Sequence, residues 1–231
     1  MTDASTDQPT IVLTHGAFHT GGCWELLADE LGARGIHTVC PDLPLTDLDA
    51  DAAVVTAVLD DCTGPVTLLG HSYGGAVITQ AGSHPNVERL VYLCALAPDA
   101  GEPASGGPVE IGADFLASMR VNDEGVAYID PALAPVVFYP DVDAVTGRRW
   151  AQQLRPGNTG GGSTVTNAAW RDRPATYVVC VDDPIILVAS QRSNAERIGA
   201  AVVEIAGDHS PMIARPAELA DVLAAVVSAS N

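Results

Sequence analysis

Short apolar runs rich in Val, Ile, Leu and Cys recur along most of this chain, and segments with helical periodicity lie between them. The runs are nearly continuous, which is typical of strands that are covered on both faces of a sheet. They predict strands at 10–14, 36–41, 66–71, 87–95, 176–182 and 201–205. Helical patterns occupy about 22–34, 47–61, 74–83, 186–198 and 216–228. This alternation predicts an α/β fold with about six mostly parallel strands and helices on both faces of the sheet.

One stretch interrupts the alternation. From about 98 to 170 the chain carries Gly and Pro clusters and no clear strand. We expect one domain over 1–231, in which this stretch is a lid inserted over the carboxyl edge of the sheet, with short helices near 115–119 and 144–154. Its large side chains would line an apolar pocket or attach the lid to the core. They are Phe115, Met119, Tyr128, Phe138, Tyr139, Trp150 and Trp170.

The segment Gly70-His71-Ser72-Tyr73-Gly74-Gly75 directly follows a predicted strand and directly precedes a predicted helix. A serine in such a strand–turn–helix context occupies a sharp, strained turn that exposes its hydroxyl, and only glycines fit two residues either side of it. The N-terminus of the following helix would face a developing oxyanion. This pattern predicts that Ser72 is a catalytic nucleophile.

A serine nucleophile needs a histidine base, which in turn needs an acidic residue to orient it. His209 follows the last predicted strand and precedes the final helix, so we expect it to be the base. The acid should follow the strand at 176–182, where Asp182 and Asp183 both stand, and alternation along the strand does not separate them. Asp208 is a third, geometrically poorer candidate because it is adjacent to the histidine.

The loop after the first strand contains His15, Ala17 and His19. We expect the backbone N–H groups of Ala17 and Tyr73 to form the oxyanion hole. The two histidines have the spacing of a metal pair but lack a nearby acidic or cysteine cluster, so a supporting structural role is expected and no metal site is predicted.

Charge and composition exclude several classes of function. The net charge of −18 disfavours binding to nucleic acids or to anionic membranes. All 11 basic residues are arginines, so a Schiff-base aldolase, a pyridoxal-phosphate enzyme and a Walker-type nucleotide site are excluded. The five cysteines include no CxxC pair and indicate neither a disulfide framework nor a zinc site. The polar residues 1–8 lack the apolar region of a secretory signal, so a cytoplasmic protein is expected.

Together these motifs resemble the α/β-hydrolase superfamily, and within it the branch of plant methylesterases, hydroxynitrile lyases and bacterial esterases. The resemblance covers nearly the whole chain and includes His15-Gly16-Ala17 with Trp24, Asp42-Leu43-Pro44, the glycine-rich segment around Ser72, 177–180 with Asp183, and His209-Ser210-Pro211. It implies that Asp183 is the acid. The hydroxynitrile lyases of this branch carry a lysine after the catalytic histidine, where this chain has Ser210, so cyanohydrin cleavage is not expected.

The function that these residues predict is hydrolysis of a carboxylic ester of a small or medium apolar molecule through an acyl-enzyme, with no cofactor. Two alternatives stay open at this stage. The same triad supports thioester, lactone or carbon–carbon bond cleavage, or a lyase or cyclase reaction. A ligand-binding protein with a vestigial triad is the other. The oligomeric state is not indicated by the sequence.

Overall fold

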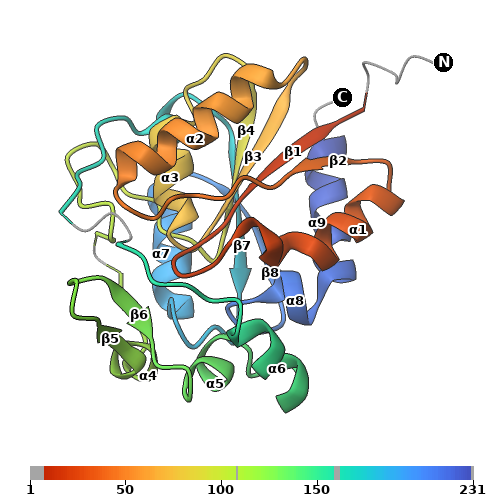
Figure 1. Ribbon diagram of the computed structural model, residues 1–231. Helices are drawn as coiled ribbons and strands as arrows, with labels where there is room; N and C mark the ends of the chain where they lie inside the picture. Colours follow the sequence, from red (N-terminus) through yellow and green to blue (C-terminus); the bar gives the residue numbers. More distant parts are fainter. Residues whose placement is uncertain (1–7, 108, 159–161, 230–231) are drawn as a thin grey trace.

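A six-stranded sheet forms the centre of the computed structural model, which describes residues 8–107, 109–158 and 162–229 (Figure 1). The strand order is β2-β1-β3-β4-β7-β8, and every neighbouring pair is parallel. The strands are β1 (Thr10–Thr14), β2 (His37–Val39), β3 (Val66–His71), β4 (Val87–Leu93), β7 (Ala175–Cys180) and β8 (Ala201–Ile205). The predicted α/β fold is confirmed, and all six expected strands are present.

Helices cover both faces of this sheet, because alternate strand residues point to opposite sides. Ile11 and Leu13 join one buried apolar cluster with helices α1 and α9, while Val12 joins the other with α2 and α3. Helix η1 (Gly21–Trp24), a short 3-10 turn, leads into α1. The remaining helices of the main fold are α1 (Glu25–Ala33), α2 (Leu48–Asp61), α3 (Gly74–Ala81), α7 (Val188–Arg197), α8 (Pro211–Ala214) and α9 (Pro216–Ser228).

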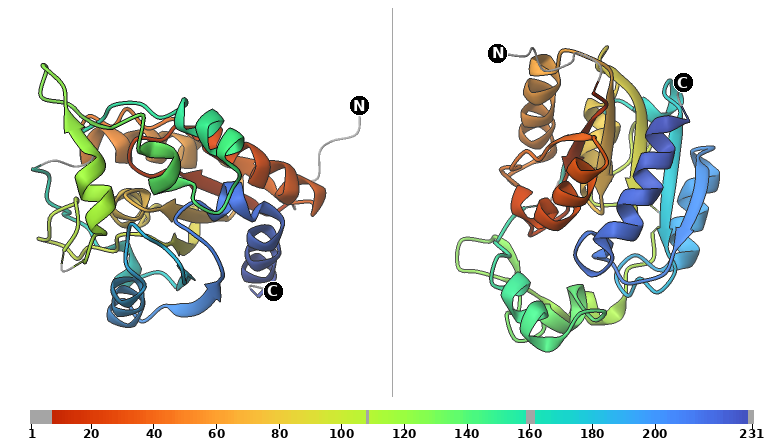
Figure 2. Two further views of the ribbon diagram at one scale, coloured as in Figure 1. Left: turned by 90° about the horizontal axis from the view of Figure 1, so that it is seen from below. Right: turned by 90° about the vertical axis from the view of Figure 1, so that its right-hand side faces the viewer.

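The segment between β4 and β7 lies across the carboxyl ends of the strands, at the bottom of Figure 1 and of the right-hand view of Figure 2. We call residues 98–170 the insertion. It contains α4 (Ala113–Ser118), β5 (Met119–Val121), β6 (Ala127–Ile129), α5 (Ala134–Phe138), α6 (Ala144–Ala151) and the start of η2 (Ala169–Arg171). The two short helices predicted there are present as α4 and α6.

The expectation that the insertion has no strand was wrong. β5 and β6 form an antiparallel hairpin, in which Met119 pairs with Ile129 and Val121 with Ala127. Its turn is stabilised by the Asn122 side chain, which accepts hydrogen bonds from the backbone N–H groups of Glu124 and Val126. Strands of three residues are too short to give an alternating pattern in the sequence.

None of the described helices is long and apolar enough to cross a membrane. The polar N-terminal stretch, on which the expected location was based, lies outside the described residues except for Gln8.

Candidate active site

Ser72 lies in the sharp turn between β3 and α3. Its φ of +54° is in the left-handed region, which residues other than glycine rarely adopt. A Cβ atom at Gly70 would collide with the backbone of Gly74, and one at Gly74 would lie 2.5 Å from the carbonyl oxygen of Thr14. Glycine is therefore required on both sides of the serine, as predicted, and the strained turn leaves Ser72 partly exposed.

His209 and Asp183 form a buried pair beside this turn. The Nδ1 atom of the imidazole lies 2.7 Å from Oδ2 of the carboxylate, and neither side chain is exposed to solvent. Because a carboxylate only accepts hydrogen bonds, Nδ1 carries the proton in the neutral ring and Nε2 presents a lone pair. Nε2 has no hydrogen-bond partner among the described residues. This tautomer is the one that a general base requires.

His71 connects the loop that carries His209 to the serine turn. Its Nε2 atom lies 2.8 Å from the backbone carbonyl oxygen of His209, to which it donates, and the two rings have centroids 4.7 Å apart. Burial holds the pKa of His71 well below its ordinary value, so the ring is neutral. Since His71 directly precedes Ser72, this contact fixes the position of the histidine loop relative to the serine turn.

Asp183 accepts four hydrogen bonds. Oδ1 accepts from the backbone N–H groups of Ile185 and Ile186, at 2.7 and 3.1 Å. Oδ2 accepts from His209 and from the amide Nε2 of Gln191, at 2.7 and 2.8 Å. All four partners are donors, so the side chain is held in one orientation. Gln191 was not singled out in the sequence, where nothing distinguishes it from other polar helix residues.

The two other candidate acids make different contacts. Oδ2 of Asp182 accepts from the backbone N–H of Gly207 at 3.2 Å, which joins the end of β7 to the histidine loop. The Asp208 side chain instead accepts from the backbone N–H groups of Asp141 and Ser210. The structure therefore brings only Asp183, among these three, to Nδ1 of His209.

The loop that contains Ala17 lies against the serine. A Cβ atom at Gly16 would be 2.8 Å from Cβ of Ser72, so a glycine is needed for this approach. The N–H groups of Ala17 and Tyr73 have no acceptor among the described residues, as an oxyanion hole requires of its donors before substrate binds. The Tyr73 side chain points away and donates its hydroxyl to Asp51 on α2 at 2.7 Å.

His15 stabilises this loop through two hydrogen bonds to the backbone. Its Nε2 atom accepts from the backbone N–H of Leu43 at 3.0 Å, so Nδ1 carries the proton and donates to the carbonyl of Gly16 at 2.9 Å. Burial lowers the pKa of His15 to about 4, and the ring is therefore neutral at pH 7. Both nitrogens are engaged with the backbone, which agrees with a structural role.

His71, Cys94 and His209 are close enough together to hold a metal ion, with one potential ligand atom of each within 4.8 Å of the others. Nε2 of His71 and Nδ1 of His209 are hydrogen-bonded, whereas the second nitrogen of each ring has no partner among the described residues. The thiol is the least suitable ligand of the three, because burial raises the pKa of Cys94 well above its ordinary value. A neutral thiol is a poor metal ligand.

Comparison with known proteins identifies the family of this chain. The model of the alpha/beta hydrolase family matches residues 11–222. This chain belongs to that family. It is 28% identical to a pyrethroid hydrolase of Sphingobium wenxiniae, over 93% of this chain and 86% of the relative, and 28% identical to a carbendazim hydrolyzing esterase of Nocardioides sp., over 93% and 98%. The crystal structure of the pyrethroid hydrolase PytH superimposes with a TM-score of 0.85 and 26% identity, over 96% of this chain and 98% of that one.

In this α/β hydrolase, aromatic residues of the insertion lie close to the site. The Phe138 ring has its centroid 6.3 Å from that of His209 and 5.7 Å from that of Phe115. Trp170, by contrast, donates its indole N–H to the carbonyl of Pro98 and so attaches one end of the insertion to the other. Of the aromatic residues expected to line a pocket or to attach the insertion, Phe138 lies beside His209 and Trp170 attaches the insertion.

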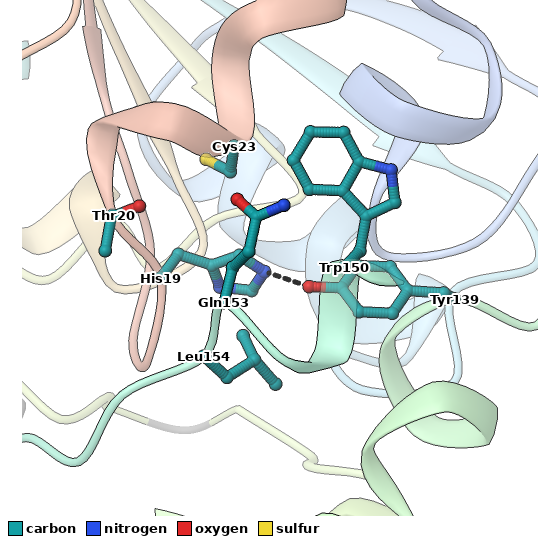
Figure 3. A pocket seen from close by; sticks show the side chains of 7 residues that line it. All are labelled: His19, Thr20, Cys23, Tyr139, Trp150, Gln153 and Leu154. Carbon is teal, nitrogen blue, oxygen red and sulfur yellow. Dashed lines mark hydrogen bonds between the residues drawn. The ribbon is translucent and has the colours of Figure 1, made fainter. Parts of the chain in front are cut away.

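Tyr139 and Trp150 line a small cavity beside His19, with a volume of about 10 Å³ that is enough for one water molecule (Figure 3). A larger groove of about 400 Å³ is lined by residues of α5, of α6 and of the segment between them, among them Val136, Tyr139 and Arg148.

Proposed function

We propose that this chain is a serine hydrolase that cleaves a carboxylic ester of a small or medium apolar molecule through a covalent acyl-enzyme. The observation that carries the proposal is the buried pair of His209 and Asp183, whose hydrogen bond of 2.7 Å leaves the Nε2 lone pair without a partner among the described residues. It stands beside a serine held at a φ of +54°. Such strain is typical of functional sites.

In the first half of the reaction, Nε2 of His209 takes the hydroxyl proton of Ser72 while the serine oxygen attacks the ester carbonyl. The carbonyl oxygen becomes an oxyanion, which the N–H groups of Ala17 and Tyr73 stabilise. The imidazolium then gives its proton to the leaving alcohol, and an acyl-serine remains. Asp183 keeps the ring in the required tautomer and stabilises its charged form.

In the second half, water replaces the alcohol. His209 removes a proton from this water as it attacks the acyl carbonyl, and the proton passes to the oxygen of Ser72 when the acid is released. Every step uses acid–base and oxyanion chemistry that these side chains supply. A metal ion or organic cofactor is not part of the proposal.

An apolar substrate is supported by the surroundings of the base. The rings of Phe138 and Phe115 lie on the insertion side of His209, and Phe18 packs against Phe115 with centroids 6.4 Å apart. Relatives named for hydrolysis of pyrethroids and carbendazim, both small molecules, agree with this substrate class. We further propose that the insertion is the lid of this site, since His209 is completely buried beneath it.

The test compares wild-type protein with a Ser72→Ala variant on p-nitrophenyl acetate and butyrate, and follows labelling of the protein by a fluorophosphonate probe with mass spectrometry. We expect the variant to lose at least about 10³-fold in kcat/KM and all labelling. Ser193→Ala removes an exposed hydroxyl on α7 and should behave as wild type. Undiminished ester hydrolysis by Ser72→Ala would overturn the proposal.

A further inference from the structure

The loop that carries the candidate oxyanion donor is itself strained. Phe18, one residue after Ala17, has a φ of +65°. A bulky aromatic residue rarely adopts this left-handed conformation, and it persists only where the surroundings impose it. Contacts that hold the loop should therefore be visible around Phe18.

Three consecutive carbonyl groups of this loop are hydrogen-bonded, two of them directly to the insertion and the third to His19, which itself contacts the insertion. The carbonyl of Phe18 accepts from the backbone N–H of Arg155 at 2.8 Å, and that of His19 accepts from the Arg155 guanidinium at 3.1 Å. The carbonyl of Ala17 lies 2.8 Å from Nδ1 of His19. Nε2 of the same ring lies 3.0 Å from the hydroxyl of Tyr139, at the end of α5 (Figure 3).

The direction of the last two hydrogen bonds follows from chemistry. Burial lowers the pKa of His19 to about 3, so the ring is neutral and has one N–H. A carbonyl oxygen only accepts, which places the proton on Nδ1. Nε2 must then accept, and the donor is the Tyr139 hydroxyl. Tyr139 therefore donates to His19, and His19 donates to the backbone carbonyl of Ala17.

The same part of the insertion also contacts the histidine loop. Two residues after Tyr139, the backbone N–H of Asp141 donates to the Asp208 carboxylate at 3.1 Å, and the N–H of Asp208 donates to the Asp141 carboxylate at 3.2 Å. Asp208 directly precedes His209. Residues 139–141 thus contact both loops that would meet at a substrate carbonyl.

We propose that Tyr139 is a positioning residue for the oxyanion hole, which acts through His19 to hold the strained loop at Ala17, so that this hole is complete only while the insertion is in place. The proposal rests on the proposed function, because it assumes that Ala17 donates to an oxyanion formed at Ser72. It differs from a covering role for the insertion, which would need no hydrogen bond to this loop.

The test uses Tyr139→Phe, which removes one hydroxyl and keeps the ring. Tyr128→Phe is the matched control, because it removes a hydroxyl from β6 of the same insertion that has no partner among the described residues. The readouts are the second-order rate of Ser72 labelling by a fluorophosphonate, and kcat and KM for p-nitrophenyl acetate. For Tyr139→Phe we expect labelling and kcat to fall about 5- to 20-fold, with KM changed less than about twofold. Tyr128→Phe should match wild type.

A double-mutant cycle shows whether Tyr139 acts through His19. His19→Gln should slow labelling at least as much as Tyr139→Phe, and the double variant should be no slower than His19→Gln alone, within about twofold. Additive losses, or wild-type labelling by Tyr139→Phe, would overturn this inference and leave the proposed function intact. A wild-type protein that is never labelled at Ser72 would overturn both.

Discussion

The sheet and the insertion are held together by different kinds of contact. In the sheet, long apolar runs such as that of β3 are buried along their whole length, and glycines permit the close approach of the turns at the carboxyl edge. The insertion also buries apolar side chains, among them Phe138 and Trp150, but it contacts the loops of His19 and His209 through a small number of hydrogen bonds as well. Tyr139 with His19 and Asp141 with Asp208 are the clearest examples.

This difference separates two tasks. The sheet region places Ser72, His209 and Asp183 on loops at one edge, because the carboxyl ends of parallel strands share that edge. The insertion adjusts the site through side chains that have partners far away in the sequence. Changes in the sheet region should therefore abolish chemistry or folding, whereas changes in the insertion should alter rates by smaller factors.

The largest effect should come from the acid on the sheet side. In Asp183→Asn, one carboxylate oxygen becomes an NH₂ donor, which cannot accept the Nδ1 proton and favours the wrong tautomer of His209. We expect kcat/KM for p-nitrophenyl acetate to fall about 10³- to 10⁴-fold, with the fold preserved by circular dichroism. Asp182→Asn is the matched control on the neighbouring residue and should stay within about fivefold of wild type. Equal losses in the two variants would mean that the acid is wrongly assigned.

A pH-dependent loss of stability should arise where the two regions meet. His15, His19 and His71 are buried, and burial lowers the pKa of His15 to about 4, that of His19 to about 3 and that of His71 well below its ordinary value of 6.5. Below pH 6.5 the unfolded chain binds protons at these rings while the folded protein does not. The free energy of unfolding should therefore decrease as pH falls from 7.5 to 5.5, by roughly 1.4 kcal/mol for each histidine and roughly 4 kcal/mol in total.

Urea unfolding at pH 7.5, 6.5 and 5.5 measures this loss. The window ends at pH 5.5 because burial raises the pKa values of Asp51 and Asp208, which act in the opposite direction at lower pH. His19→Gln should remove about a third of the loss. A flat stability between pH 7.5 and 5.5 would contradict the neutral, buried state of the three rings.

Most of the sheet could be predicted from the sequence. The bounds of β1, β3 and β8 agree with the prediction to the residue, because β-branched runs between turn residues have few alternatives. The helix expected at 186–198 begins at Val188, since residues 183–187 form the turn whose N–H groups bind Asp183. Asp182 and Asp183 lie beyond the end of β7, next to or within this turn, so the alternation of residues along the strand could not distinguish them.

The insertion and the supporting side chains of the site could be predicted much less well. Tyr139 was expected to line a pocket or attach the insertion, but a contact with His19, 120 positions away, leaves no local pattern. Gln191 is one polar residue in a polar helix, and only the fold places it against Asp183. Ser72, His209 and Asp183 as catalytic residues stay predictions, although the structure brings the histidine and the aspartate into contact.

The two regions should also differ in how they tolerate a cavity. Val91 in β4 and Val137 in α5 are both buried and belong to the same apolar cluster. Val91→Ala should lower the free energy of unfolding by about 2–3 kcal/mol, because the sheet around it cannot relax. Val137→Ala should lower it by about 1 kcal/mol or less, because a five-residue helix at the edge of the fold opens locally before the whole protein unfolds.

Urea unfolding compares the two variants, and limited proteolysis locates the opening. Cleavage within the insertion should become faster in Val137→Ala while cleavage elsewhere does not change. If the two variants lost equal stability, the insertion would be as integral to the cooperative core as the sheet, and the contrast between the two regions would fail.

The smallest effect should come from Gln191, which orients the acid without touching the histidine. Its Nε2 donates to the same Asp183 oxygen that accepts the proton of His209. Gln191→Met keeps the size of the side chain and removes this donor, so the carboxylate is less firmly held and Oδ2 becomes a stronger acceptor for His209. We expect kcat/KM to fall about tenfold, with KM nearly unchanged, since the amide affects orientation of the base and not substrate binding. The Nδ1 proton resonance of His209 should move downfield as its hydrogen bond strengthens, which a loss of packing alone would not produce. A variant with normal kcat and an unmoved resonance would contradict this role of Gln191. It would show that the backbone N–H groups of Ile185 and Ile186 are enough to orient the Asp183 carboxylate.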